Sequence, residues 1–235
     1  MSMMIEIRAL KGAAVAASRD ETRAYLTGVM VCAHTENNVG AGLYDAEREG
    51  QAVLVATDGH RMVVGMGMPI NAADIEEKLP EGVSIEPHNP ETWEETIIPA
   101  DMVKAILRVK VRKDLQRMVG AGYIWLHREG DALRAVFYDG QVVQGFKAVG
   151  DAYPDWKRVF NPCLAYKDSP TCVNGMGFCA GYLADLDTFA YAFGHQKTGS
   201  VQMFGHADNA MSPVVFVANS PDLHKGYYLL MPMRL

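Results

Sequence analysis

The chain has 235 residues, of which 49% are hydrophobic and 21% are charged, a composition ordinary for a soluble globular protein. Its formal net charge of −6 argues against a protein that coats nucleic acid over its whole surface, but leaves room for a local basic face. No apolar run approaches the roughly 20 residues that span a membrane, and the N-terminus lacks the regions of a signal peptide, so we expect a cytoplasmic protein.

The first part of the chain predicts a strand, a helix and then further strands. Residues 5–19 indicate a short strand running into a helix, because apolar residues recur there at helical spacing. Residues 25–33 predict a strand, and the polar residues 34–50 predict a loop. The run 53–64 predicts a β-hairpin, since Asp58-Gly59 between two β-prone apolar segments is a strong turn signal.

A second unit is expected after an acidic connection. Residues 71–95 are rich in Asp, Glu and Pro, which predicts a solvated connection without a regular element. A new strand starts at residues 96–99, and a helix is expected from about Ala100 to Gln116. Strands are then predicted at 122–127, 133–138 and 142–148.

The last part of the chain predicts one more unit of the same kind. After residues 150–170, the pattern indicates a strand at 171–178 and a helix at 180–193. Three strands are then expected, at 201–204, 214–218 and 227–231, with a turn at 219–222 between the last two.

An internal repeat follows from these predictions. Residues 5–70, 96–149 and 171–235 each follow the order strand, helix, antiparallel strands. Repetition of one supersecondary unit is a stronger guide to fold than any single element. The sequence therefore predicts an α+β fold built from repeated βαβββ units.

Four motifs carry a resemblance to a known family: RAYLTG (23–28), ATDGHR (56–61), YPDWKRV (153–159) and YLLMPMRL (228–235). In these letters and this order, the chain resembles the bacterial DNA polymerase III beta subunit, the DNA sliding clamp. The resemblance implies the DNA-clamp fold, in which two βαβββ units make one domain, with helices on one face of antiparallel sheets.

The resemblance also implies a domain division. Residues 1–149 match a complete clamp-like domain, residues 150–170 an interdomain linker, and residues 171–235 half of a clamp-like domain. By this comparison the chain is a truncated form that lacks the family's first domain and part of its last.

A peptide-binding pocket is the strongest functional implication of the resemblance. In sliding clamps, polymerases and other partners insert a short, partly hydrophobic peptide between two domains. Apolar walls with a few polar groups suit such a peptide, although a hydrophobic C-terminal strand taken alone is ordinarily core. The match of Tyr182 depends on a weaker motif than the others. Carried over residue by residue, the pocket comprises Leu26, Thr57, Gly59, His60, Arg61, Met62, Pro154, Arg158, Val159, Tyr182, Met231, Pro232, Met233 and Arg234.

A basic stripe is the second candidate site. Lys104, Arg108 and Arg112 are spaced four residues apart and would share one face of the predicted helix, where they could contact DNA phosphates without reading sequence. A solvated helix face is the alternative. The resemblance places this helix on the DNA-facing side, whereas the acidic Asp185 and Asp187 on the next predicted helix weaken the DNA interpretation.

Catalysis and metal binding have little support in the sequence. Asp58 and His60 could suggest acid–base chemistry, but no motif places a nucleophile beside them. The sparse cysteines form no CxxC pair, and their spacing to His195 and His206 matches no closed zinc pattern. No phosphate-binding loop or dinucleotide motif is present. We therefore expect no cofactor, no metal and no enzymatic activity.

Two functions remain as hypotheses. The first is a clamp-like processivity factor that tethers DNA polymerase or other replication and repair factors to duplex DNA, with a clamp loader as a further partner. The second is a non-encircling clamp mimic or adaptor that competes for the same peptides. Since the third unit has no second half, self-association is expected in either case.

Overall fold

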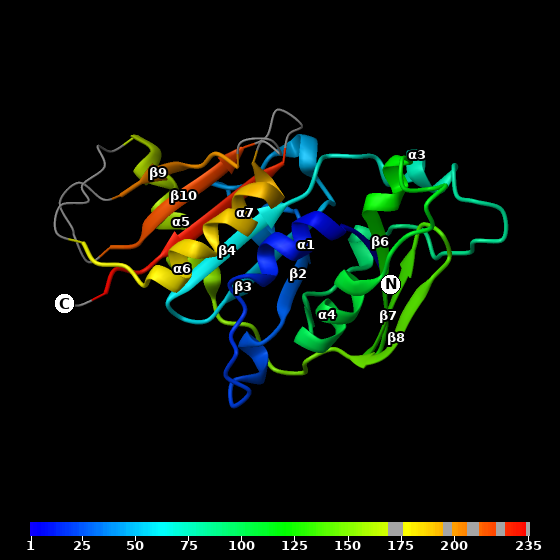
Figure 1. Cartoon of the computed structure of the whole chain (residues 1–235), viewed down its shortest axis with the longest axis horizontal. Coiled ribbons are helices and arrows are strands. Elements are labelled where there is room, and N and C mark those ends of the chain that lie inside the picture. Colours follow the sequence, from blue (N-terminus) through cyan, green and yellow to red (C-terminus); the bar gives the residue numbers. More distant parts are fainter. Residues whose placement is uncertain (169–175, 195–198, 206–211, 220–223, 234–235) are drawn as a thin grey trace.

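Antiparallel strands form two sheets, which the computed structural model describes for residues 1–168, 176–194, 199–205, 212–219 and 224–233 (Figure 1). The smaller sheet has the order β1-β6-β7-β8. Met4 of β1 lies opposite Trp125 of β6. The strands of the smaller sheet are β1 (Ser2–Glu6), β6 (Tyr123–Glu129), β7 (Ala132–Phe137) and β8 (Val142–Lys147).

The larger sheet has the order β5-β2-β3-β4-β11-β10-β9. The first strand of each of the first two units therefore pairs in the sheet of the other unit: β1 with β6, and β5 with β2. The third unit joins the sheet of the first through β11, which pairs with β4. The strands are β5 (Thr96–Ile98), β2 (Val29–Ala33), β3 (Ala52–Thr57), β4 (Arg61–Met66), β11 (Lys225–Leu230), β10 (Val214–Asn219) and β9 (Gln202–Phe204).

One long helix from each unit covers the same side of the sheets. These helices are α1 (Ile7–Ala14), α4 (Ala100–Arg108) and α7 (Leu186–Phe193), which lie in front of the sheets in Figure 1. Their apolar side chains share one core with alternate strand residues such as Leu54 and Val63. Because strand side chains alternate between faces, Val53 and Val64 point the other way, into a second core.

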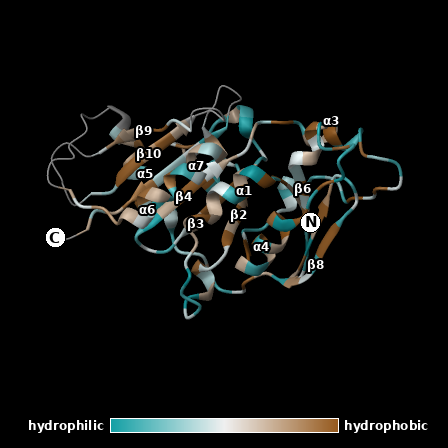
Figure 2. Cartoon of the chain, viewed as in Figure 1, coloured by the Kyte–Doolittle hydropathy of each residue, from teal (hydrophilic) through white to brown (hydrophobic). Residues whose placement is uncertain are grey.

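The opposite face of the large sheet is covered by α5 (Trp156–Leu164). Phe160 is fully buried, and its ring meets that of Tyr227 edge-on at 5.2 Å. Except for its edge strand β9, the large sheet is thus buried on both faces, which is why these strands are almost continuously hydrophobic. Figure 2 shows the brown of hydrophobic residues along strands such as β10.

The remaining elements are short. They are the helices α2 (Glu36–Val39), α3 (Ala72–Glu76) and α6 (Ala180–Ala184), and the 3₁₀ turns η1 (Ala24–Leu26), η2 (Ala46–Arg48), η3 (Pro90–Thr92), η4 (Val119–Gly122) and η5 (Ala165–Asp168).

The α+β fold class and the hairpin prediction are confirmed, and most predicted strands are found within a few residues of their expected bounds. The predicted strand 171–178 and the turn 219–222 lie mostly outside the described residues. The domain boundaries near residues 149 and 170 stay a prediction, since the large sheet and its cores run across them.

The predicted helix 100–116 is too long, because α4 ends at Arg108. Beyond Arg108, side chains of the turn between β7 and β8 bind the backbone and hold it in a non-helical conformation. Asp139 accepts a hydrogen bond from the backbone N–H of Arg112 at 2.8 Å, and Gln141 donates one to the carbonyl of Lys110 at 2.9 Å. Arg112 is therefore not on the same helix face as Lys104 and Arg108.

The acidic connection 71–95 is also more regular than predicted, because it contains α3. The Asn71 side chain caps this helix by accepting a hydrogen bond from the N–H of Ala73 at 3.1 Å. Ile75 is buried in a small core with Trp125 and Tyr138. Burial against the small sheet thus stabilises a helix that charge composition alone did not indicate.

Candidate functional site

The β3–β4 turn is the centre of the candidate site, and its own side chains hold it in shape. The Oδ1 atom of Asp58 accepts hydrogen bonds from the backbone N–H groups of His60 and Arg61, at 2.9 and 3.0 Å. Thr57 Oγ1 donates to the carbonyl of Arg61 at 2.7 Å and accepts from the N–H of Gly59 at 3.1 Å. Gly59 has φ of +91°, a conformation that favours glycine.

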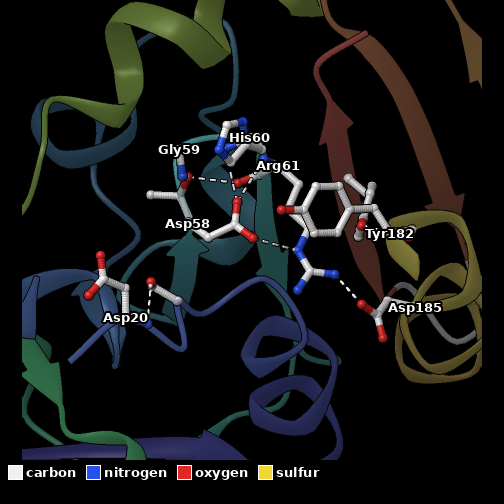
Figure 3. Close-up of polar contacts among 10 residues, drawn as sticks. Asp20, Asp58, Gly59, His60, Arg61, Tyr182 and Asp185 are labelled. Carbon is white, nitrogen blue, oxygen red and sulfur yellow. Dashed lines mark hydrogen bonds and ion pairs between the residues drawn. The ribbon is translucent and has the colours of Figure 1, made fainter. Parts of the chain in front are cut away.

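Arg61 connects this turn to the third unit (Figure 3). Its guanidinium donates to Asp58 at 3.0 Å and forms an ion pair with Asp185, between α6 and α7. The ring of Tyr182 lies against it, 4.4 Å from the guanidinium carbon. Burial lowers the pKa of Arg61, but hydrogen bonds to Tyr228 and Asp185 outweigh that effect, so the pKa is raised and the side chain stays charged.

Tyr228 completes this cluster from β11. Its hydroxyl donates to the backbone carbonyl of Tyr182 at 2.8 Å. Burial raises the pKa of Tyr228 to about 12, against the opposing effect of Arg61. Burial also raises the pKa of Tyr182. Both phenols are therefore neutral hydrogen-bonding groups near pH 7.

The other wall of the site is α5, which the YPDWKRV motif begins. Asp155 caps the helix by accepting a hydrogen bond from the N–H of Arg158 at 3.3 Å. Trp156 is buried beside Phe160 in the second core, which lies between α5 and the large sheet. This anchoring leaves Val159 half exposed on the side of the helix that faces the hairpin turn.

An apolar cavity of about 490 Å³ lies between these walls. The end of β11 approaches the turn, where the N–H of Met231 donates to the carbonyl of His60 at 2.9 Å. Nine residues of the predicted pocket line the cavity: Leu26, Thr57, Gly59, His60, Arg61, Met62, Pro154, Val159 and Met231. The structure thus brings together residues from four separate parts of the sequence, while their role in binding peptide stays a prediction.

The other predicted pocket residues lie elsewhere. Tyr182 lines the neighbouring polar cavity, and Arg158 is exposed on α5 without lining the apolar cavity. Pro232 and Met233 lie past the end of β11, where the N–H of Met233 donates to the carbonyl of Gly177 at 2.8 Å. Arg234 lies outside the described residues.

Further lining residues were not predicted from the sequence. Most belong to α5 and the turn after it, in a stretch that the sequence predicted only as an interdomain linker, although Pro154-Asp155 is typical of a helix start. Leu229 comes from β11, and Pro213 precedes β10. The full added set is Asp155, Trp156, Pro162, Cys163, Tyr166, Pro213 and Leu229. Burial raises the pKa of the Cys163 thiol, so this sulfur is an uncharged part of the wall.

A second, polar cavity of about 480 Å³ adjoins the first, and His60 and Arg61 line both. It contains Asp58, Tyr182 and Asp185, together with charged residues that follow α1, among them Arg19 and Asp20. The hairpin turn is therefore the partition between an apolar and a polar compartment.

The basic residues of the second candidate site do not form a single stripe. Lys104 and Arg108 are exposed one turn apart on α4, and Lys104 pairs with Asp101 at 3.1 Å. Arg112 lies off the helix and pairs with Asp114 at 2.7 Å. Exposed pairs of this kind are weak, so these cations can exchange their carboxylate partners for phosphates.

Asp58 binds the turn backbone and Arg61, which gives it a structural role. In the part of the chain that the structure describes, no three His, Cys, Asp or Glu side chains are grouped to hold a metal ion. Nor does any described helix have the length and apolar character needed to cross a membrane.

The architecture and the site together define the class of fold, which is that of the bacterial DNA sliding clamps. The chain superimposes over its whole length on the DnaN sliding clamp (DNA polymerase III subunit beta) of Bartonella birtlesii bound to griselimycin, with a TM-score of 0.58 and 17% identity. It matches the DNA polymerase III beta subunit of Thermotoga maritima with a TM-score of 0.60 and 14% identity, and the sliding clamp of Pseudomonas aeruginosa with 0.58 and 15%.

The chain spans 66% of the length of each of these three clamps. Comparison with protein-family models and with curated proteins finds no match. The likeness to these clamps thus lies in the fold and in a few short motifs, while the sequence identity is low, at 14 to 17%.

Proposed function

We propose that this protein is a clamp-like tether that binds short peptides of DNA polymerase or of other replication and repair factors in the apolar cavity, and holds these partners on duplex DNA. The observation that carries the proposal is the gathering of nine motif residues around one cavity of about 490 Å³. A cavity of this volume accommodates one or two large side chains of a docking peptide.

The chemistry of the cavity favours an apolar anchor within a polar frame. Met62, Val159 and Leu229 provide apolar walls, while Asp155 and Arg61 contribute the charged groups of the lining. Burial of an apolar side chain supplies most of the affinity in such a site, and the polar groups fix the orientation of the peptide. The Bartonella birtlesii clamp, which was solved with griselimycin bound, has the same fold and supports a ligand-binding role.

Fluorescence anisotropy with a labelled peptide, Gln followed by a Leu- and Phe-rich end, tests the proposal. Val159→Asp places a charge on the cavity wall at a side chain that is already 45% exposed, so the fold is expected to survive. Val142→Asp is the matched control, because Val142 is 46% exposed on β8. We expect Val159→Asp to weaken binding by about tenfold or more, and Val142→Asp to leave it unchanged.

Equal affinity of the wild type and a folded Val159→Asp variant would remove the apolar cavity from consideration as the binding site. Unlabelled griselimycin, the ligand of the Bartonella birtlesii clamp structure, is added as a competitor in a second measurement.

A clamp mimic or adaptor that binds the same peptides without encircling DNA is the second candidate. It is favoured by the position of Arg112, which is off α4 and paired with Asp114, so that the basic helix face is smaller than the sequence suggests. Retention on circular DNA, with release after the circle is cut, distinguishes a tether that encircles DNA from an adaptor.

The same proposal includes a cytoplasmic location, the absence of catalysis and, for an encircling form, the help of a clamp loader. The location and the absence of catalysis stay predictions from the sequence, and the clamp loader stays a prediction from its resemblance to sliding clamps.

A further inference from the structure

The contact between Arg61 and Asp185 joins two parts of the chain that are 124 residues apart in sequence. Arg61 begins β4 of the first unit, whereas Asp185 lies at the break between α6 and α7 of the third. The Arg61 side chain is only 5% exposed, and that of Asp185 is 34% exposed. Asp185 therefore reaches the buried guanidinium from a partly exposed position, and Figure 3 shows it on the side of the guanidinium away from Asp58.

The effect of this contact extends to the wall of the apolar cavity. The Tyr182 ring lies against the Arg61 guanidinium at 4.4 Å, and it stacks on the His60 ring with centroids 6.3 Å apart and planes 23° apart. His60 and Arg61 form the partition between the apolar and polar cavities. The Tyr182 ring thus lies between the guanidinium and the His60 ring, and its hydroxyl also contacts Asp58.

We propose that Asp185 is a positioning residue for the peptide site. By holding Arg61, it keeps Tyr182 and His60 in place beside the partition between the two cavities. The packing of the third unit against the first is thereby coupled to peptide affinity. The proposal rests on the peptide-binding function proposed above. It assigns to Asp185 a role that neither the motifs nor the lining of the apolar cavity indicated.

Loss of the Asp185 carboxylate is expected to shift the Tyr182 and His60 rings without disrupting the β3–β4 turn. Asp58 holds the turn through backbone N–H groups, and these two hydrogen bonds do not involve Asp185. The guanidinium would keep its contacts with Asp58 and Tyr228 but lose its second anionic partner, so we expect it to shift relative to the Tyr182 ring. A buried cation that loses a partner seeks another or moves toward water.

The test compares Asp185→Asn with Asp187→Asn, which removes the same charge two residues further along, at an exposed position in the first turn of α7. We expect Asp185→Asn to weaken binding of the labelled peptide by about tenfold, the effect of losing one charge-assisted contact. Asp187→Asn should bind as the wild type does, and Asp185→Glu should recover most of the affinity.

A second measurement, made without peptide, separates positioning from direct contact or from stability. The imidazole C–H protons of His60, assigned with a His60→Gln variant, should show the ring-current shift that stacking on Tyr182 produces. We expect this shift to diminish in Asp185→Asn and to persist in Asp187→Asn. Thermal unfolding of each variant shows that the comparison is between folded proteins.

The outcomes distinguish this proposal from the one on which it rests. If the wild type does not bind the peptide, both proposals fail. If the wild type binds and Asp185→Asn binds equally well, or if the His60 shift is the same in both, only the positioning role is overturned. Weaker binding of Asp185→Asn with an unchanged His60 shift would mean that Asp185 contacts the peptide itself, which also overturns positioning.

Discussion

At the scale of single residues, the turn motif acts mainly as a structural support for the site. The Asp58 carboxylate is 12% exposed, and it binds two backbone N–H groups and the guanidinium of Arg61. The carboxylate oxygens thereby order a turn whose apolar neighbours line the cavity. An aspartate and a histidine two residues apart, which could suggest acid–base chemistry, are here explained by turn geometry.

Replacement of Asp58 by alanine should therefore lower the free energy of unfolding by about 3 kcal/mol, because it leaves a largely buried cation with one partner fewer and two turn N–H groups unsatisfied. Asp58→Asn should cost less, since its amide oxygen can still accept from both N–H groups. Urea denaturation monitored by circular dichroism measures both values.

Asp20 is a suitable control for this prediction. It accepts hydrogen bonds from the N–H and hydroxyl of Thr22 in an exposed turn. Asp20→Ala should change stability far less than Asp58→Ala does, because water replaces these contacts. A similar loss in Asp58→Ala and Asp20→Ala would contradict the structural role of the turn motif.

At the scale of elements, one aromatic side chain fits α7 against the first unit. Phe193 is fully buried and is surrounded by glycines of three elements: Gly12 on α1, Gly65 on β4 and Gly226 on β11. A Cβ added at Gly65 would lie 2.2 Å from the Phe193 ring, and one at Gly226 would lie 2.4 Å from it. The absence of side chains at these positions creates the space in which the third unit packs.

We expect Gly65→Ala to lower the free energy of unfolding by about 2 kcal/mol or more, because the added methyl group overpacks the contact with Phe193. Combining it with Phe193→Leu should cost less than the sum of the two single changes, since the smaller side chain makes room. The measurement is a double-mutant cycle in urea. Gly122→Ala, at an exposed position with no atom within 4 Å of the new Cβ, is the control.

The shortened α4 changes the expected DNA contact. Lys104 and Arg108 remain on one exposed face of this helix, whereas Arg112 is carried by the following loop. In the proposed tether, a helix face can lie along phosphates, while a loop cation paired with Asp114 contributes less.

Charge reversal should therefore separate the two positions. We expect Lys104→Glu with Arg108→Glu to weaken DNA association and to reduce the slope of log affinity against log salt by about 2, the number of phosphate contacts removed. Arg112→Glu alone should have a smaller effect. Filter binding across a salt series measures this, and equal effects of all three changes would restore a continuous stripe.

At the scale of the whole molecule, the two sheets of the described chain have four edge strands, β1, β8, β5 and β9, of which β8 and β9 expose large apolar side chains. Among the described residues, β8 pairs only with β7 and β9 only with β10. Met203 on β9 is 39% exposed and Val142 on β8 is 46% exposed. Exposed apolar area is unfavourable by roughly 25 cal/mol per Å², and open strand edges favour pairing with another chain.

The first two units show how βαβββ units combine, because each gives its first strand to the sheet of the other. We expect the third unit to do the same with its counterpart in a second copy, so that the protein is at least a dimer in solution. Two such dimers could then close a ring of four chains.

Light scattering at micromolar concentration tests this assembly. Met203→Lys should lower the mass toward that of a monomer, whereas Val142→Lys, at the other edge, should leave the dimer intact. A strictly monomeric wild type would rule out the shared domain and, with it, encirclement of DNA by the protein alone.

Elements with strong local signals were predictable from the sequence. The hairpin at Asp58-Gly59 and the strands of the second unit depend on turn chemistry and short-range apolar patterns, which neighbouring residues specify. Nine residues that line the apolar cavity were also named from the sequence, because four short motifs carry the resemblance to sliding clamps in their letters, while their role in binding peptide stays a prediction.

The tertiary structure decided the features that depend on contacts between distant residues. Local propensity favours continuing α4 past Arg108, but the β7–β8 turn binds the backbone there and ends the helix. The sequence presents Asp185 only as an acidic residue of a predicted helix, yet it pairs with a buried arginine 124 residues away. Tyr166 and Pro213 enter the cavity wall only because α5 packs across the large sheet. Such contacts follow from the burial of apolar surface by elements that have no short-range sequence relation, so no local pattern could predict them.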